Sequence, residues 1–201
     1  MQALPPKVTT PLDHSLFLKK VLTLSVLVPN SHIHPFQKRF GKWLLTAPKF
    51  KPCQVLANDP LRKRMILKDL KSEPEADIKL RAHVESYNQE KKEEMDWIVV
   101  ENDHAIELTY ENYNMSDALR VLLPNVPDNE IPSGFECIGD IAHLNILNEE
   151  CIKKKYQIGQ VVLDKNSTVR TVVRKVGQIE SQFRFYNLEC IAGEKDNYET
   201  V

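Results

Sequence analysis

The sequence predicts an α+β fold made of two small mixed domains, residues 1–107 and 108–201. Three observations lead to this prediction. The chain has 201 residues, of which 42% are hydrophobic and 27% charged, a composition typical of a soluble globular protein with room for two small cores. Short strand patterns alternate with amphipathic helical patterns along its length. No internal repeat or low-complexity tract interrupts them.

The first half of the chain contains six expected elements. A helix over 12–21 starts with Asp13 as its N-cap, and the β-rich run LTLSVLV follows over 22–28. A short amphipathic helix covers 36–44. Two strands, 55–57 and 65–67, are joined by the turn signal Asn58-Asp59-Pro60. A long, highly charged helix covers 75–97, and the residues expected along one side of it are Ile78, Ala82, Glu85 and Gln89.

The second half begins with a strand over 106–110 and a helix capped by Asn114 and ended by Pro124. A proline-rich loop over 124–132 leads into strand-like residues 134–146, which Gly134 and Gly139 interrupt. Residues 149–163 fit a strand or a helix, and the spacing of their apolar residues favours the helix. Two strands, 168–176 and 183–192, complete the chain.

Several classes of site find no support in the sequence. There is no GxGxxG motif, no Walker loop and no Gly-x-Ser-x-Gly elbow. The four cysteines are widely spaced, which argues against a disulfide framework or a zinc site and fits a reducing compartment. His32 and His34 have no further ligand nearby, so no metal is expected. The longest apolar stretch, over 21–28, is too short to cross a membrane.

Charge is distributed unevenly, although the formal net charge is only −1. Basic residues dominate over 49–71 and again over 151–175, and acidic residues dominate over 73–107. Such asymmetry indicates nucleic-acid binding better than net charge does, and ordinary solvated faces are the alternative. In the expected strand 168–176, Arg170 and Arg174 project from the same face, and Lys165 and Asn166 in the turn before it suit phosphate or sugar contacts.

Arg184 stands out because it lies between two phenylalanines in a strand pattern near the end of the chain. An arginine drawn out of water needs a partner. Its planar donor fork suits a phosphate or the carbonyl edge of a base. The alternative is a structural ion pair with Glu180 or Glu189.

Several stretches resemble the eukaryotic and archaeal tRNA (guanine-37) N1-methyltransferase family, in the order in which that family has them. They are PPKVTTPLDHSLFLKKVLTLSVLV (5–28), LTYENYNMSDALRVLLP (108–124), IPSGFECIGDIAHLNI (131–146), KYQIGQVVLDKNSTVRTVVRKVGQI (155–179) and QFRFYNLECIAGE (182–194). The resemblance covers essentially the whole chain and is closer after residue 106. Ser167 stands where the family has proline, and Ile146-Leu147 stands where it has Leu-Arg.

The resemblance implies an N-terminal tRNA-corner-binding-like domain over 1–107 and a middle domain over 108–201. The family's C-terminal Rossmann-like domain, which binds S-adenosylmethionine, would be missing. The whole protein would transfer a methyl group from S-adenosylmethionine to N1 of guanine 37 of tRNA, and the 201 residues alone would be inactive. Arg184 would be catalytic, stabilising charge on the base oxygen. The expected tRNA contacts are Lys153, Lys154, Lys155, Lys165, Asn166, Arg170 and Arg174.

Two other functions stay open for the chain: a non-catalytic tRNA-binding module and a structural or protein-interaction domain. The expected partner is tRNA, without membrane association, and the expected state is a monomer. The expected location is the cytoplasm, the nucleus or both, with a mitochondrial pool as a further alternative.

Overall fold

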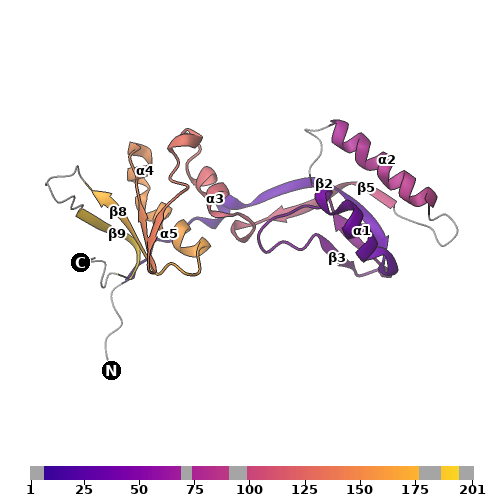
Figure 1. Cartoon of the computed structure of the whole chain (residues 1–201), viewed down its shortest axis with the longest axis horizontal. Helices are drawn as coiled ribbons and strands as arrows, with labels where there is room; N and C mark the ends of the chain where they lie inside the picture. The colour runs from indigo at the N-terminus through magenta and orange to yellow at the C-terminus, as the bar shows by residue number, and fades with distance from the viewer. Residues whose placement is uncertain (1–6, 69–73, 91–98, 177–186, 195–201) are drawn as a thin grey trace, which may run out of the picture. The chain divides into compact units, whose positions relative to one another are not determined.

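The chain forms two compact units, each of which contains both helices and sheet (Figure 1). The computed structural model describes residues 7–68, 74–90, 99–176 and 187–194. One unit is Leu18–Asn112, here called the 18–112 unit. In the other, the C-terminal unit, the described residues up to Phe17 belong with the described residues from Tyr113 onward. The mixed helix and sheet content of the expected fold class is confirmed, whereas the domains 1–107 and 108–201 and their roles stay predictions.

The 18–112 unit is built on an antiparallel four-stranded sheet in the order β3-β4-β2-β5. The long strand β2 (Lys19–Pro29) lies between β4 (Asp59–Ile66) and β5 (Val99–Leu108). β3 (Cys53–Leu56) forms a hairpin with β4, in which Leu56 pairs with Asp59. The hairpin confirms that two strands meet at a turn here, but the turn is at 57–58, and Asp59 and Pro60 of the predicted turn already belong to β4, which starts six residues before the predicted strand 65–67.

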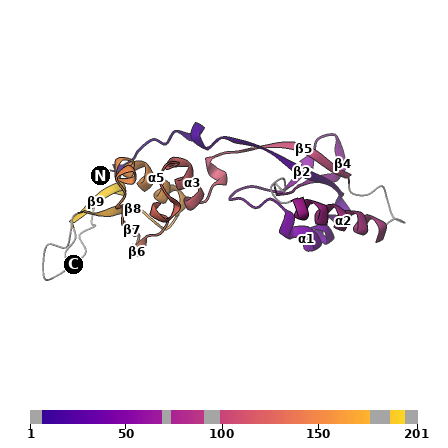
Figure 2. The ribbon, with the colours of Figure 1, turned by 90° about the horizontal axis from the view of Figure 1, so that it is seen from above.

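Two helices, α1 (Ile33–Phe40) and α2 (Pro74–Glu90), lie together on one face of this sheet (Figure 2). Phe40 is fully buried at the centre of the contact. Its ring lies 4.5 Å from the ring of Phe36 and 5.8 Å from those of Trp43 and Tyr87. Aromatic pairs at these separations add stabilisation beyond the area that they bury. The amphipathic helix predicted over 36–44 is confirmed in part: α1 ends at Phe40 and a 3₁₀ helix covers Gly41–Trp43, and both contribute to a core that β2, β4 and α2 share.

Two predictions for the first half are wrong. The expected helix over 12–21 is a short 3₁₀ helix, His14–Phe17, and Lys19 already belongs to β2, which pairs with β5 from its first residue. A β-branched, alternating run gains more from this ladder than from a helix. On α2 the buried side chains are Leu80, Val84 and Tyr87, at helical spacing, whereas Ile78 on the predicted side is exposed.

The C-terminal unit is built on a five-stranded sheet in the order β1-β9-β8-β7-β6, most of which Figure 2 shows. The strands are β1 (Lys7–Val8), β6 (Glu136–Ile138), β7 (Ile141–Leu144), β8 (Thr171–Val176) and β9 (Asn187–Glu194). β7 and β8 are parallel, and the other neighbours are antiparallel. A parallel pair needs a crossover connection, and α4 (Glu149–Lys153) and α5 (Lys155–Lys165) provide it. The helical prediction for 149–163 is confirmed over the strand alternative, although the segment forms two helices that are separated at Lys154.

Helix α5 packs on β9 and β8, and α3 (Met115–Leu122) packs on α5. Asn114 caps α3 as predicted: its Oδ1 accepts the backbone N–H of Asp117 at 2.8 Å. The core between helices and sheet is apolar, and its fully buried members include Leu119, Leu144, Ile158, Val162, Val172 and Ile191. Gly139, with φ of 61°, makes the turn between β6 and β7, which confirms the predicted break in 134–146.

The strand predicted over 168–176 is shorter than expected. β8 starts at Thr171, and Arg170 lies before it, where its backbone N–H donates to the carbonyl of Asp140 at 2.8 Å. Arg170 and Arg174 therefore do not both project from one strand face, contrary to the prediction. Of the strand predicted over 183–192, residues 183–186 lie outside the described residues, and β9 accounts for the rest.

Candidate nucleic-acid interface

The parallel strands β7 and β8 end at the same edge of the C-terminal sheet. In open sheets with helical crossovers, ligands bind at the carboxyl ends of the parallel strands. At this edge Lys155 and Tyr156 begin α5, Arg174 lies near the end of β8, and Glu189 lies near the start of β9. We call these four residues the carboxyl-end cluster.

Glu189 is the centre of the carboxyl-end cluster. Its Oε1 lies 2.5 Å from Nζ of Lys155 and 3.3 Å from the hydroxyl of Tyr156. Its Oε2 accepts Nε–H of Arg174 at 2.5 Å. The Arg174 side chain is only 13% exposed. One carboxylate therefore ties the first turn of α5 to the ends of two neighbouring strands.

The protonation of Glu189 follows from these contacts. Burial alone raises the pKa of the Glu189 carboxyl, but the hydrogen bonds from Lys155 and Arg174 outweigh burial and lower the pKa below its usual value. Glu189 is thus an anion at neutral pH, and it neutralises only one of the two cations that it holds. The cluster keeps a positive formal charge, which suits contact with a polyanion.

Two of the predicted tRNA contacts, Lys153 and Arg170, are exposed at the surface. Nζ of Lys153 lies 2.5 Å from Oε1 of Glu150, and its side chain is 67% exposed. Nη1 of Arg170 lies 3.8 Å from Oδ2 of Asp140, and its side chain is 66% exposed. Exposed ion pairs contribute little free energy, so a phosphate can compete for either cation.

Two other predicted contacts complete helix ends. Nζ of Lys154 donates to the carbonyl of Leu122, the last residue of α3, at 2.7 Å. The Nδ2 group of Asn166 donates to the carbonyl of Val162 near the end of α5, also at 2.7 Å. Both bonds satisfy carbonyls that a helix leaves unpaired at its carboxyl end. These interactions give both residues a role in the fold, whatever they contact in a complex.

The seven predicted tRNA contacts do not form one strip. Lys155 and Arg174 meet at Glu189, at the carboxyl end of β8. Lys165 and Asn166 end α5, and Arg170 precedes β8 at its opposite end. The predicted catalytic residue, Arg184, lies outside the described residues. Whether any of these residues touches RNA stays a prediction.

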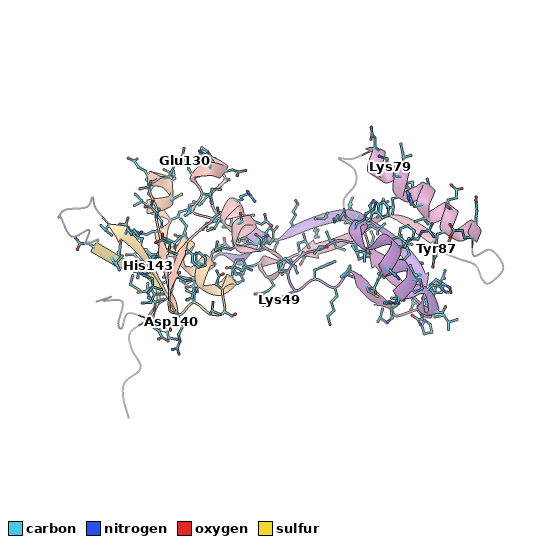
Figure 3. The ribbon with its side chains drawn as sticks, in the orientation of Figure 1. Lys49, Lys79, Tyr87, Glu130, Asp140 and His143 are labelled. Atoms are coloured by element: carbon cyan, nitrogen blue, oxygen red, sulfur yellow. The ribbon has the colours of Figure 1, made fainter. Side chains whose placement is uncertain are left out.

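Sequence reasoning did not single out His143, which lies on β7 within the stretch IAHLN (Figure 3). The residue is 7% exposed, and its Nε2 has no hydrogen-bond partner among the described residues. Burial lowers the pKa of His143, and the nearby Lys175 lowers it further, while Glu136 opposes them. A polar residue inside an apolar strand pattern was the available signal.

Close packing explains why glycine occupies two positions, Gly159 and Gly193, in the stretches 155–179 and 182–194 that resemble the methyltransferase family. A Cβ on Gly159 of α5 would lie 3.0 Å from the carbonyl oxygen of Ile191 and 3.1 Å from Cβ of Ala192, so the glycine lets the helix approach β9 closely. Gly193 has φ of 88°, and a Cβ there would lie 2.0 Å from the carbonyl oxygen of Arg170. The glycine of the Ala-Gly-Glu sequence is thus required where β9 passes close to the backbone of Arg170.

Within ranges 7–68, 74–90, 99–176 and 187–194, no three His, Cys, Asp or Glu side chains gather closely enough to hold a metal ion. None of the described helices has the length and apolar character to cross a membrane.

Comparison with known proteins identifies related sequences. The family model of the TYW2 N-terminal domain matches residues 115–196. A tRNA (guanine(37)-N(1))-methyltransferase of Dictyostelium discoideum is 36% identical over 185 residues, which are 92% of this chain and 37% of that protein. A protein of the same name from Cryptococcus neoformans is 35% identical over 206 residues, covering 96% of this chain and 35% of that protein.

Among solved structures, the crystal structure of wild-type Trm5b from Pyrococcus abyssi matches with a TM-score of 0.47 and 20% identity, over 86% of this chain and 43% of that one. The chain thus spans little more than a third of the length of the two curated relatives, and their similarity extends over nearly all of it. Over nearly its whole length the chain is thus similar to tRNA (guanine-37) N1-methyltransferases, as the resemblance in its sequence predicts.

Proposed function

We propose that the protein containing this chain transfers a methyl group from S-adenosylmethionine to N1 of guanine 37 of tRNA, and that residues 1–201 handle the tRNA. The observation that carries the proposal is the 36% identity to a relative named for this reaction, over 92% of the chain. Because the chain spans 37% of that relative, we assign methyl-donor binding to sequence outside residues 1–201.

The chain's own contribution to the chemistry would be electrostatic. When N1 of guanine loses its proton and attacks the methyl group, negative charge develops on the base oxygen. A guanidinium held next to that oxygen stabilises the charge, and Arg184 is the residue to which the family resemblance assigns this role. S-adenosylmethionine would supply the methyl group.

The protein would act in the cytoplasm or the nucleus, with a mitochondrial pool as the alternative.

The tRNA contacts would come from cations that the fold leaves accessible. Lys153 and Arg170 are exposed and only weakly paired, so their ion pairs can open toward phosphate. Lys155 and Arg174 form half-buried ion pairs with Glu189 and would act through the net positive charge of the carboxyl-end cluster. With exposed Arg170 before β8 and the positively charged carboxyl-end cluster at the other end of the strand, the RNA backbone would cross the sheet edge between them.

A methyl-transfer assay on tRNA tests the proposal. The natural gene product that contains residues 1–201 should incorporate labelled methyl groups from S-adenosylmethionine into tRNA. Stoichiometric tRNA binding without incorporation would favour the alternative, a non-catalytic tRNA-binding module. Absence of both binding and incorporation would favour a structural or protein-interaction domain.

A further inference from the structure

Tyr156 presents an aromatic ring at the carboxyl ends of the parallel strands β7 and β8. The residue is 40% exposed. It is the one exposed aromatic residue in the part of the chain that the structure describes, where every other phenylalanine, tyrosine or tryptophan is buried or half-buried. Tyr156 therefore offers a flat apolar surface at the edge where open sheets with helical crossovers bind ligands.

Two contacts hold the ring of Tyr156 in place. Its hydroxyl, on α5, donates to Oε1 of Glu189 on β9 at 3.3 Å. Nζ of Lys155 lies 5.0 Å from the centre of the ring, within the range of a cation–π interaction. A side chain that is already ordered loses less conformational entropy when a ligand covers it. The exposed part of the ring is thus preorganised for a stacking contact.

The charges around the ring indicate the kind of ligand. Glu189 accepts hydrogen bonds from both Lys155 and Arg174, so the carboxyl-end cluster combines two cations with one anion. An uncharged aromatic compound would use only the ring, and a free phosphate would use only the cations. A nucleotide uses both, because its base stacks and its phosphate is attracted by the positive charge. A base must be unpaired to stack on a side chain, which favours single-stranded RNA.

We propose that Tyr156 is a stacking site for an unpaired base of tRNA, and that Lys155 and Arg174 attract the phosphate next to that base. This inference rests on the proposed function, since it takes tRNA as the ligand. Tyr156 is not among the seven tRNA contacts that the sequence predicts. Every base has a π-face, so the site adds affinity and places a loop nucleotide without reading the sequence of the RNA.

Three substitutions at Tyr156 separate stacking from a structural role of the hydroxyl. Tyr156→Ala removes the ring, and the tRNA Kd of the natural gene product should rise at least about fivefold. Tyr156→Phe removes the bond to Glu189 but keeps the ring, so the Kd should stay within about twofold of wild type. Tyr156→Leu keeps apolar bulk without a π-face and should resemble Tyr156→Ala. Equal losses for Tyr156→Phe and Tyr156→Ala would overturn the proposal, because they would assign the effect to the bond with Glu189.

A matched control and a salt titration test whether the loss comes from the ring. Ile138→Ala removes a side chain that is 52% exposed, and Ile138 pairs with the first residue of β7, at the opposite end of the parallel strands. This variant should leave the tRNA Kd unchanged. The dependence of log Kd on log salt concentration should have the same slope in Tyr156→Ala as in wild type, because stacking releases no counterions. A slope that falls by about one would mean that the ring acts through charge, and would contradict the proposal.

The fluorescence of 2-aminopurine reports the stacked base directly. This base analogue is placed in turn at each unpaired position of the anticodon loop in otherwise identical tRNA transcripts. At one position, binding of wild type or Tyr156→Phe should change the fluorescence, and binding of Tyr156→Ala should not. The same fluorescence changes with wild type and Tyr156→Ala at every position would overturn the proposal.

These outcomes are distinguishable from those that test the proposed function. A wild-type protein that does not bind tRNA refutes both proposals. Binding without methyl transfer refutes the proposed reaction and leaves the stacking site to be decided by the variants. Methyl transfer with equal tRNA Kd values for wild type and Tyr156→Ala refutes only the stacking site. Weaker binding of S-adenosylmethionine by Tyr156→Ala, with an unchanged tRNA Kd, would also refute it, because the ring would then serve the methyl donor.

Discussion

Replacing Gly193 with alanine should destabilise the C-terminal unit more than the same change at Gly134, Gly139 or Gly159, the unit's other glycines within the described residues. The added Cβ would lie 2.0 Å from the carbonyl oxygen of Arg170, 2.9 Å from its carbonyl carbon and 3.0 Å from Cα of Thr171. Non-bonded carbon contacts lie near 3.5 Å, so the backbones would have to separate by roughly 1.5 Å. All three atoms belong to the main chain, and no flexible side chain can move aside.

The expected cost has two parts. Alanine in the left-handed region costs about 1–2 kcal/mol. Separation of the strands also breaks the bond from the N–H of Glu194 to the carbonyl of Arg170, 3.2 Å, and that from Oγ1 of Thr171 to the carbonyl of Glu194, 3.0 Å. Each such bond contributes about 0.5–1.5 kcal/mol. Together these terms give roughly 2–5 kcal/mol, a large share of the roughly 5–15 kcal/mol by which domains are stable.

Thermal unfolding followed by circular dichroism measures this loss, and two other glycines serve as controls. For a unit of this size, each kcal/mol corresponds to about 4–8 °C, so Gly193→Ala should lower the melting temperature by at least about 8 °C. At Gly139 φ is positive, but no atom lies within 4 Å of an added Cβ, so Gly139→Ala should cost about 1 kcal/mol. Gly134→Ala, with open space and no positive φ, should stay within about 0.5 kcal/mol. A Gly193→Ala protein that melts within about 2 °C of wild type would refute the reasoning.

Two further predictions concern the C-terminal unit. The lowered pKa of His143 means that the unfolded chain binds more protons, so stability should be complete above the ordinary value of 6.5 and fall as pH drops below it. His143→Phe should remove that part of the pH dependence in urea unfolding, and an unchanged slope would contradict its assignment to His143. Asn114→Ala removes the cap of α3 and should cost about 1 kcal/mol, whereas Asn114→Ser should retain most of the stability. Equal melting temperatures for the two variants would contradict the capping role.

Local signals in the sequence were sufficient where the structure is decided locally. Asn114 is a capping residue followed by an apolar helical pattern, and it caps α3. Phe36 and Phe40 lie one helical turn apart and fill a core. The turn between β3 and β4 includes Asn58, the first residue of the predicted Asn-Asp-Pro turn signal. In each case the determining residues lie within a few positions of one another.

Predictions failed where long-range pairing decides the structure. The helix expected over 12–21 gave way to β2 because β5, more than 80 residues later in the chain, supplies its ladder partner. Long-range pairing also places β1 beside β9, and no local pattern in the sequence indicated that strand. On α2, the choice of Ile78 over Leu80 came from an ambiguous apolar stripe, which packing against Phe40 resolves.

The candidate site also combines features that the local sequence predicts with features that depend on long-range pairing. The basic stretch 151–175 was visible from composition, but its division between two ends of β8 depends on the crossover through α5. Glu189 entered the sequence analysis only as an alternative partner for Arg184. In the structure it holds Lys155 and Arg174, which lie 34 and 15 residues away. Such a cluster forms only when the sheet order is known.

The central claim, that this chain belongs to a protein which methylates guanine 37 of tRNA, is tested most directly by changing that one base. Two tRNA transcripts identical except for G or A at position 37 are incubated with the natural gene product containing residues 1–201 and labelled S-adenosylmethionine. The account predicts that label enters only the G37 transcript and is recovered as 1-methylguanosine. Equal labelling of both transcripts, or none of the G37 transcript, would contradict it.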